Sequence, residues 1–175
     1  MRRNPAARLA CIAAVRIVLA ACAGAPPGVQ PVDGFEVERY MGTWFEVARL
    51  PNRFERGLER ITATYSLAQD GTVRVVNRGY DAASGEWREA VGRARFRGDP
   101  EVAALEVSFF GPFYGGYNVV ELDPEYGYAL VAGPTRGYLW VLARQPTLPE
   151  PVLQRLAGRA ASLGFDVSEL LYVRH

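Results

Sequence analysis

Hydrophobic and polar residues alternate along most of the chain between residues 43 and 144. Alternation with a period of two is typical of strands with one buried face, and Gly, Pro and Asp residues separate the runs. The dipeptide Asp70-Gly71 between two such runs is a strong hairpin signal. The predicted strands are 43–50, 60–68, 72–80, 86–97, 101–110, 113–122, 126–132 and 137–144. This all-β pattern predicts an antiparallel meander of eight strands, either a sandwich or a closed up-and-down barrel.

The period changes after residue 146. Segment 147–164 has apolar residues at helical spacing, which predicts one amphipathic α-helix packed against the outside of the sheet. The apolar positions are Leu153, Leu156, Ala157, Ala160 and Leu163. Thr147 followed three residues later by Glu150 matches a capping box at the start of this helix. A short final strand over 169–174 completes a single domain over 35–175.

The N-terminal segment has the organisation of an export signal. Residues 1–21 begin with several arginines, continue with an apolar stretch and end in small residues, which predicts a signal peptide. The sequence Leu19-Ala20-Ala21-Cys22 resembles the bacterial lipobox, in which the cysteine is lipidated and becomes the new N-terminus. The alternative is a chance run of small residues before a cysteine, and Arg16 within the apolar stretch is unfavourable for membrane insertion. We predict lipidation at Cys22.

Residues 22–34 are rich in Pro and Gly and show no periodicity, which predicts a tether between the lipid and the domain. Ala23 stands where an Asp tends to retain sorted bacterial lipoproteins in the inner membrane. By that resemblance, the expected location is the outer membrane, on its periplasmic side.

Charge and reactive side chains exclude several functional classes. The chain has 20 basic and 19 acidic residues, and cleavage before Cys22 removes four arginines and no acid, which leaves 16 against 19 and a net charge of −3. This balance argues against a nucleic acid partner. Cys11 and Cys22 leave the domain without a disulfide, and His175 is the single histidine, so neither a Ser-His-Asp triad nor a histidine metal site is available. We expect no catalytic residue, no metal and no cofactor.

Three motifs in order give the domain a family resemblance. Gly42-Thr43-Trp44 matches the first lipocalin motif, segment 126–131 occupies the second, and Arg144 matches the third. Segment 107–117 resembles in particular the bacterial outer-membrane lipoprotein branch, which is also similar to apolipoprotein D. The resemblance implies a closed eight-stranded barrel that holds a hydrophobic ligand. We expect Trp44 to plug the closed end and Arg144 to lie across its indole ring as a cation–π pair.

Alternation predicts which side chains face the interior. If Trp44 faces inward, Glu46, Ala48 and Leu50 share its side of the strand. A buried carboxylate needs a bonding partner or water. Glu46 therefore either bonds Arg144 or a tyrosine as part of the structure, or orients the polar head of a ligand.

The same alternation in the other strands gives an apolar lining with polar groups at intervals. The candidate ligand contacts are Glu46, Tyr65, Asn77, Phe96, Phe109, Tyr117 and Trp140. For Phe96 and Phe109 the ordinary core role is favoured over specific ligand contact, because aromatic residues fill protein interiors in any case. Tyr65, Asn77 and Trp140 are stronger candidates because a polar group that faces a cavity needs a partner.

The predicted function is a membrane-anchored protein that binds a fatty acid or lysophospholipid for lipid storage or transport in the cell envelope. The first alternative is a structural or interaction lipoprotein with a filled barrel, whose aromatic rim at 113–117 serves a partner or a homodimer. The second is a lipid-modifying enzyme that relies on Glu46 or a tyrosine for proton transfer, for which the sequence offers little support.

Overall fold

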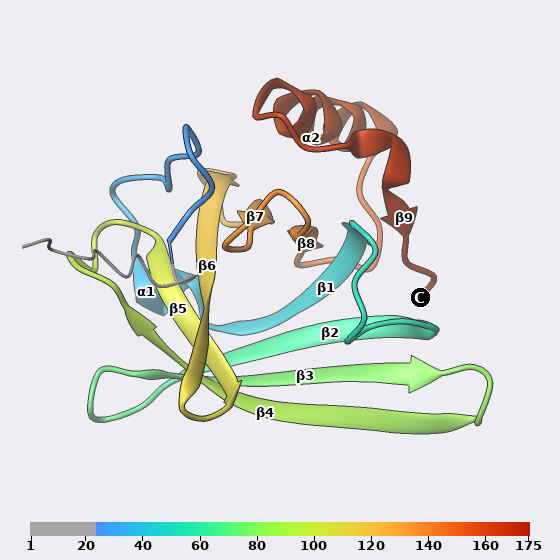
Figure 1. Cartoon of the computed structure of the whole chain (residues 1–175), viewed down its shortest axis with the longest axis horizontal. Coiled ribbons are helices and arrows are strands. Elements are labelled where there is room, and N and C mark those ends of the chain that lie inside the picture. Colours follow the sequence, from blue (N-terminus) through green and yellow to red (C-terminus); the bar gives the residue numbers. More distant parts are fainter. Residues whose placement is uncertain (1–23) are drawn as a thin grey trace, which may run out of the picture.

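The structure is a computed structural model that describes residues 24–175, so the predicted signal peptide and Cys22 lie outside the described residues. Within them, one continuous antiparallel sheet closes into a barrel, and Figure 1 shows its strands β2, β3 and β4 lengthwise. The barrel strands are β1 (Gly42–Arg49), β2 (Leu58–Leu67), β3 (Val73–Asp81), β4 (Glu86–Phe96), β5 (Ala104–Phe110), β6 (Phe113–Leu122), β7 (Tyr128–Ala132) and β8 (Leu139–Ala143). Because β1 pairs with both β2 and β8, the barrel is closed, which confirms the predicted fold and excludes a sandwich.

Turn chemistry explains the strand ends. At the Asp70-Gly71 turn between β2 and β3, Gly71 has a φ of 76° and Asp70 Oδ1 accepts a hydrogen bond of 3.1 Å from the backbone N–H of Thr72. The predicted hairpin is therefore confirmed. The fifth strand starts three residues later than predicted, because the N–H of Ala103 bonds the carbonyl of Val32 instead of a neighbouring strand.

A β-bulge in β1 changes the side-chain directions that alternation predicts. The register against β8 shifts between Glu46 and Ala48. Trp44 lies in the barrel interior, whereas Ala48 and Leu50 belong to a second hydrophobic cluster outside the barrel. The prediction that Ala48 and Leu50 share the face of Trp44 is therefore wrong, because the extra residue of a bulge reverses the alternation.

The closed end of the barrel is built around Trp44, which is fully buried. The Arg144 guanidinium carbon lies 4.0 Å from the centroid of the Trp44 ring, and the guanidinium donates hydrogen bonds to the carbonyls of Arg39, Met41 and Thr43. Gly42 has a φ of 94°, and a Cβ atom there would approach Arg144 Nη1 to 3.3 Å. These contacts join the short helix α1 (Val37–Tyr40) to the floor of the barrel.

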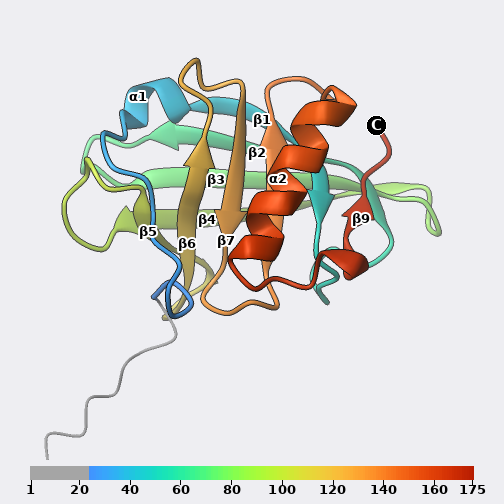
Figure 2. The same ribbon diagram turned by 90° about the horizontal axis from the view of Figure 1, so that it is seen from above.

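Helix α2 (Glu150–Ser162) lies across the outside of the barrel, as Figure 2 shows. Leu156 and Ala160 are fully buried against outward-facing residues of β1, β6, β7 and β8. The helix starts later than predicted and has no side-chain cap, because Glu150 is its first residue and its carboxylate accepts a hydrogen bond from Gln154. The predicted capping box is therefore wrong.

The chain ends outside the barrel. The short 3-10 helix η1 (Val167–Glu169) leads into β9 (Leu171–Tyr172), which pairs with the end of β1. The final strand that the sequence predicts over 169–174 is thus present but only two residues long.

Part of the predicted tether packs against the barrel. The backbone N–H of Val32 bonds the carbonyl of Val119, Arg136 bonds the carbonyl of Pro27, and Val29 is buried in the cluster under α2. Isolated apolar residues between prolines and glycines provide these contacts without any periodicity. The segment from residue 24 is thus attached to the domain, and the boundaries 1–21, 22–34 and 35–175 stay predictions.

Candidate functional site

The barrel encloses a cavity of about 100 Å³. A cavity of this size accommodates several water molecules or a stretch of alkyl chain. Its lining residues come from α1 and the segments on either side of it, from the loop after β1 and from β1, β2, β3, β4, β5, β6 and β8. Because β1 starts at the floor, the 50–57 loop that follows it lies at the other end of the barrel, which we call the open end, and its Glu55 lines the cavity.

Six of the seven candidate ligand contacts line this cavity. They are Glu46, Tyr65, Asn77, Phe109, Tyr117 and Trp140. The seventh, Phe96, does not line it and packs against Phe35, with ring centroids 6.2 Å apart. The structure thus brings most candidates together, and their contact with a ligand stays a prediction.

Three tyrosine hydroxyls meet in the interior. Tyr117 Oη lies 2.7 Å from Tyr40 Oη and 2.9 Å from Tyr65 Oη, so it is the centre of a hydrogen-bonded trio. Burial raises the pKa of all three phenols. The hydroxyls therefore stay protonated near neutral pH and act as neutral hydrogen-bonding groups.

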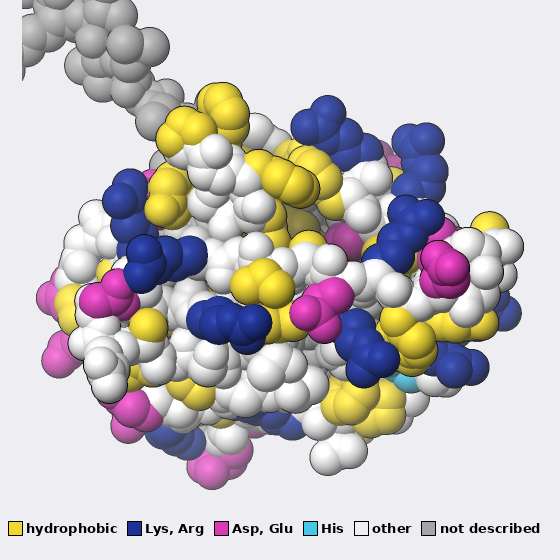
Figure 3. All heavy atoms as spheres, turned by 90° about the horizontal axis from the view of Figure 1, so that it is seen from below, with side chains coloured by type: hydrophobic (Ala, Val, Ile, Leu, Met, Phe, Trp, Pro, Cys, Tyr) yellow, Lys and Arg dark blue, Asp and Glu magenta, His cyan; other side chains and the backbone are white. Residues whose placement is uncertain are grey.

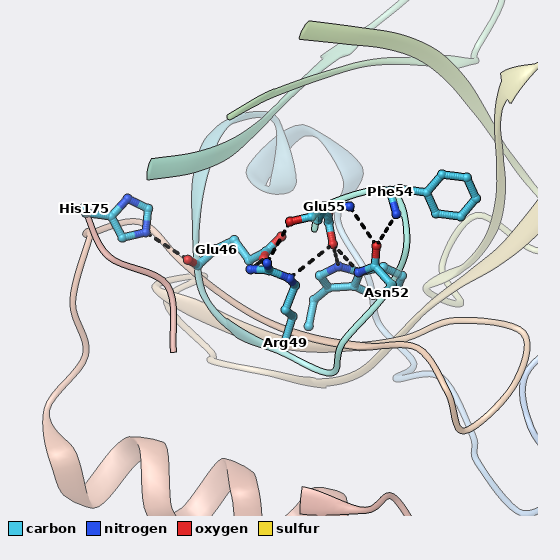
Figure 4. Close-up of polar contacts among 7 residues, drawn as sticks. Glu46, Arg49, Asn52, Phe54, Glu55 and His175 are labelled. Atoms are coloured by element: carbon cyan, nitrogen blue, oxygen red, sulfur yellow. Dashed lines mark hydrogen bonds and ion pairs between the residues drawn. The ribbon is translucent and has the colours of Figure 1, made fainter. Parts of the chain in front are cut away.

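Glu46 is bonded by a residue that sequence reasoning did not select. Arg49 Nη1 donates a hydrogen bond of 3.0 Å to Glu46 Oε1, and both side chains are buried. Figure 4 shows Glu46, Arg49 and Glu55 pointing toward one another beneath the 50–57 loop. The expected partners, Arg144 or a tyrosine, are wrong, because the bulge in β1 turns Arg49 to the same side as Glu46.

Glu55 extends from the 50–57 loop into the barrel. Its carboxylate accepts a hydrogen bond of 3.1 Å from Trp140 Nε1 and another from Asn52, and its backbone carbonyl accepts one of 2.9 Å from Arg49 Nη2. These contacts fix the loop over the opening. Asn52 Oδ1 also accepts the N–H groups of Phe54 and Glu55, which gives the loop its turn.

Burial raises the pKa of Glu46 well above its usual range, and the nearby charge of Glu55 raises it further. Arg49 acts in the opposite direction but is shared between two carboxylates. Adding a proton to this cluster is therefore favourable, whereas adding a further anion is not.

Arg49 and Glu55 are the residues of this cluster that sequence analysis missed. A buried carboxylate such as that of Glu46 requires a nearby cation, and this could have indicated Arg49. Strict alternation, however, placed Arg49 on the outer face. Glu55 lies in a loop, where no periodicity indicates which side chains turn inward.

The rim of the opening carries exposed aromatic residues. Phe110 and Phe113 face each other across the turn between β5 and β6 and are 72% and 79% exposed, and Phe54 of the 50–57 loop is 57% exposed. Figure 3 shows the barrel from below the view of Figure 1, where hydrophobic side chains lie in separate groups among arginines and acidic residues.

The cavity offers apolar walls, phenol hydroxyls, an amide and two carboxylates. Among residues 24–175, no three His, Cys, Asp or Glu side chains gather in a way that could hold a metal ion. No helix in this part of the chain has the length and apolar character to cross a membrane.

Comparisons with known proteins agree with this architecture. The family model of the lipocalin-like domain matches residues 35–175. The outer membrane lipoprotein Blc of Escherichia coli (strain K12) is 52% identical over 167 residues, which cover 95% of this chain and 94% of that protein. Apolipoprotein D of Mus musculus is 33% identical over 153 residues and covers 82% of this chain and 78% of that protein.

Solved structures support the same fold at low sequence identity. Insecticyanin from the tobacco hornworm Manduca sexta superposes with a TM-score of 0.70 at 19% identity and covers 87% of each chain. The motifs, the closed barrel with its outer helix, and the family match over the whole domain lead to one conclusion. The chain belongs to the lipocalin family.

Proposed function

We propose that this protein is an outer-membrane lipoprotein that holds one acyl-chain lipid, a fatty acid or a lysophospholipid, in its barrel. The observation that carries the proposal is the cavity, whose walls are apolar except at Glu46, Glu55, Asn77 and the tyrosine trio. An apolar cavity with a few convergent polar groups is the usual form of a small-molecule site. A barrel filled by its own side chains would have no such space, so the cavity favours lipid binding over the purely structural alternative.

A role in the storage or transport of lipid in the cell envelope is supported by the location of the protein at the outer membrane. The names of the bacterial relatives place them in the outer membrane as lipoproteins, and this supports the same location for this chain. The carbonyl of Gly24 lies 3.5 Å from the Asn118 amide nitrogen, at the end of the barrel where β7 finishes. Because only Ala23 separates Cys22 from Gly24, a lipid on Cys22 would hold the barrel against the membrane surface.

The role that fits this cavity is binding without chemical conversion. Glu46 and Glu55 are already bonded by Arg49 and Trp140, so neither carboxylate is positioned as an independent general base. A homodimer stays a proposal, for which the exposed Phe110 and Phe113 offer a surface.

The test is a fluorescence titration of delipidated protein with a lysophospholipid and with a long-chain fatty acid. Trp140 lines the cavity, so its emission should change and saturate near one ligand per barrel or per dimer. The variant Ala94→Phe places a ring in the cavity and should abolish the response. Its control, Val91→Phe, adds the same ring to the outward side of the same strand and should leave the response unchanged.

Two results would refute the proposal. One is a flat titration with several lipids of both classes. The other is a response that survives Ala94→Phe and is lost in Val91→Phe, because it would place the ligand on the outer surface.

A further inference from the structure

The charged groups of the cavity are all of one sign. Among the described residues, the lining includes the carboxylates of Glu46 and Glu55 but no arginine or histidine. Arg49 bonds Glu46 Oε1 and the Glu55 backbone carbonyl, and its Nε lies 3.8 Å from Glu55 Oε2. Two of the three guanidinium nitrogens are thus hydrogen-bonded within the cluster, and the Nε is buried without a hydrogen bond. A ligand anion would meet two acids that already share this one cation.

The uncharged polar groups of the lining include hydrogen-bond acceptors with free capacity. Asn77 Oδ1 is buried without a partner and lines the same cavity. Trp140 Nε1 already donates to Glu55. Two of the three hydroxyl protons of the tyrosine trio form the two hydrogen bonds within the trio. One O–H therefore stays available as a donor.

We infer that this barrel selects amphiphiles whose polar group donates hydrogen bonds, such as an ammonium, hydroxyl or amide head, over those with an ionised carboxylate. The inference rests on the proposed lipid-binding function and narrows its ligand class. A buried acceptor gains from a donor, whereas like charges placed side by side in a desolvated site repel each other strongly. A fatty acid would enter this site as the neutral acid.

Several titratable groups surround Glu46 and Glu55 and influence the preference for a head group that donates hydrogen bonds. Arg49 faces Glu46 from β1, Glu55 faces it from the loop, and Tyr65 faces it from β2. On the other side of β1, His175 Nε2 lies 2.9 Å from the Glu46 backbone carbonyl and not from its carboxylate. Lowering the pH protonates the ligand carboxylate and Glu46, whose pKa is raised by burial, and both changes favour entry of a fatty acid.

The experiment compares three probes with the same alkyl chain: dodecylammonium, dodecanol and dodecanoate. Each is titrated into the delipidated protein below its aggregation limit, with Trp fluorescence as the readout. At neutral pH, the amine and the alcohol should bind at least about tenfold more tightly than dodecanoate. The ratio between alcohol and carboxylate should shrink as the pH falls toward the pKa of the free acid.

The double variant Glu46→Gln/Glu55→Gln leaves Arg49 as the charge beneath the loop. It should reverse the order, so that dodecanoate binds more tightly than dodecylammonium. Its control is Glu121→Gln, which removes an acid paired with Arg155 on the outside of the barrel and should keep the original order. If the double variant does not fold, the pH dependence of the unmodified protein decides the question.

Equal affinity for all three probes, independent of pH, would overturn the inference while leaving the proposed function intact. Such a result would mean that the head stays in solvent near the exposed arginines of the 50–57 loop. Failure of every probe to bind would overturn the proposed function and this inference with it.

Discussion

Replacement of Arg49 by methionine is the most direct perturbation of the buried acidic cluster. The Arg49 side chain is 6% exposed, and those of Glu46 and Glu55 are 4% and 15% exposed. Methionine keeps much of the side-chain volume but removes the cation that both carboxylates share. The variant thus isolates the electrostatic role of Arg49 from its packing.

The expected cost follows from the burial of the pair. Removing one partner of a buried ion pair typically lowers the free energy of unfolding by about 3–5 kcal/mol, because the remaining charge has lost its compensation. The raised pKa of Glu46 limits this cost, since the carboxyl group can respond by taking up a proton. We therefore expect the full loss at alkaline pH and a smaller loss at mildly acidic pH.

Urea unfolding followed by circular dichroism, at one alkaline and one mildly acidic pH, measures both values. The double variant Arg49→Met/Glu46→Gln should recover part of the loss, and a double-mutant cycle isolates the coupling between the two residues. The control is Arg155→Met, which breaks a half-exposed pair with Glu121 under α2. Such a pair contributes about 0–1 kcal/mol.

If Arg49→Met lowers the free energy of unfolding no more than Arg155→Met does, Arg49 is not the compensating charge of a buried pair. An equal loss of unfolding free energy at both pH values would likewise refute the proton uptake by Glu46.

Three further predictions concern the floor, the outer helix and the titration of Glu46. Arg144→Lys should lower the unfolding free energy by about 2–3 kcal/mol and alter the near-ultraviolet circular dichroism of Trp44, because an ammonium cannot reproduce the planar guanidinium contacts. Leu156→Ala should cost about 2–5 kcal/mol in urea unfolding without changing lipid affinity, since this fully buried side chain lies outside the barrel. The raised pKa of Glu46 means that its stabilising contribution is complete below its unfolded pKa and is lost as the pH rises through its folded pKa. The melting temperature should therefore fall with rising pH by a step that Glu46→Gln lacks.

The fold was predictable because each of the eight barrel strands shows the same local pattern of alternating hydrophobic and polar residues. Period-two alternation gave each strand, and Asp70-Gly71 gave a hairpin with the required positive φ. Strand ends were less certain because they depend on contacts from distant segments. The N–H of Ala103 bonds the carbonyl of Val32 instead of a neighbouring strand, and Tyr126 leaves the expected seventh strand to adopt a φ of 59° in the turn before β7.

The floor could be anticipated from side-chain chemistry, whereas the polar end of the cavity could not. An indole and a guanidinium have a preferred geometry, and Trp44 and Arg144 adopt it across 100 positions of sequence. The interior candidates followed from alternation, so most of them line the cavity. Glu55 reaches it from a loop, and loop side chains have no period from which their direction can be inferred.

The bulge in β1 explains why the direction of Glu46 was predicted correctly and the directions of Arg49, Ala48 and Leu50 were not. Regular alternation would leave Glu46 inside the barrel without a cation and would place Arg49 in the outer cluster beside α2, and both positions are costly for a charge. One additional residue between Glu46 and Ala48 resolves both conflicts, because it turns Arg49 inward while Ala48 and Leu50 turn toward the helix. A buried acid followed three residues later by a base in the same strand therefore indicates a bulge. The departure from the regular pattern occurs where the barrel acquires its charged groups, which is where local rules are expected to give way to function.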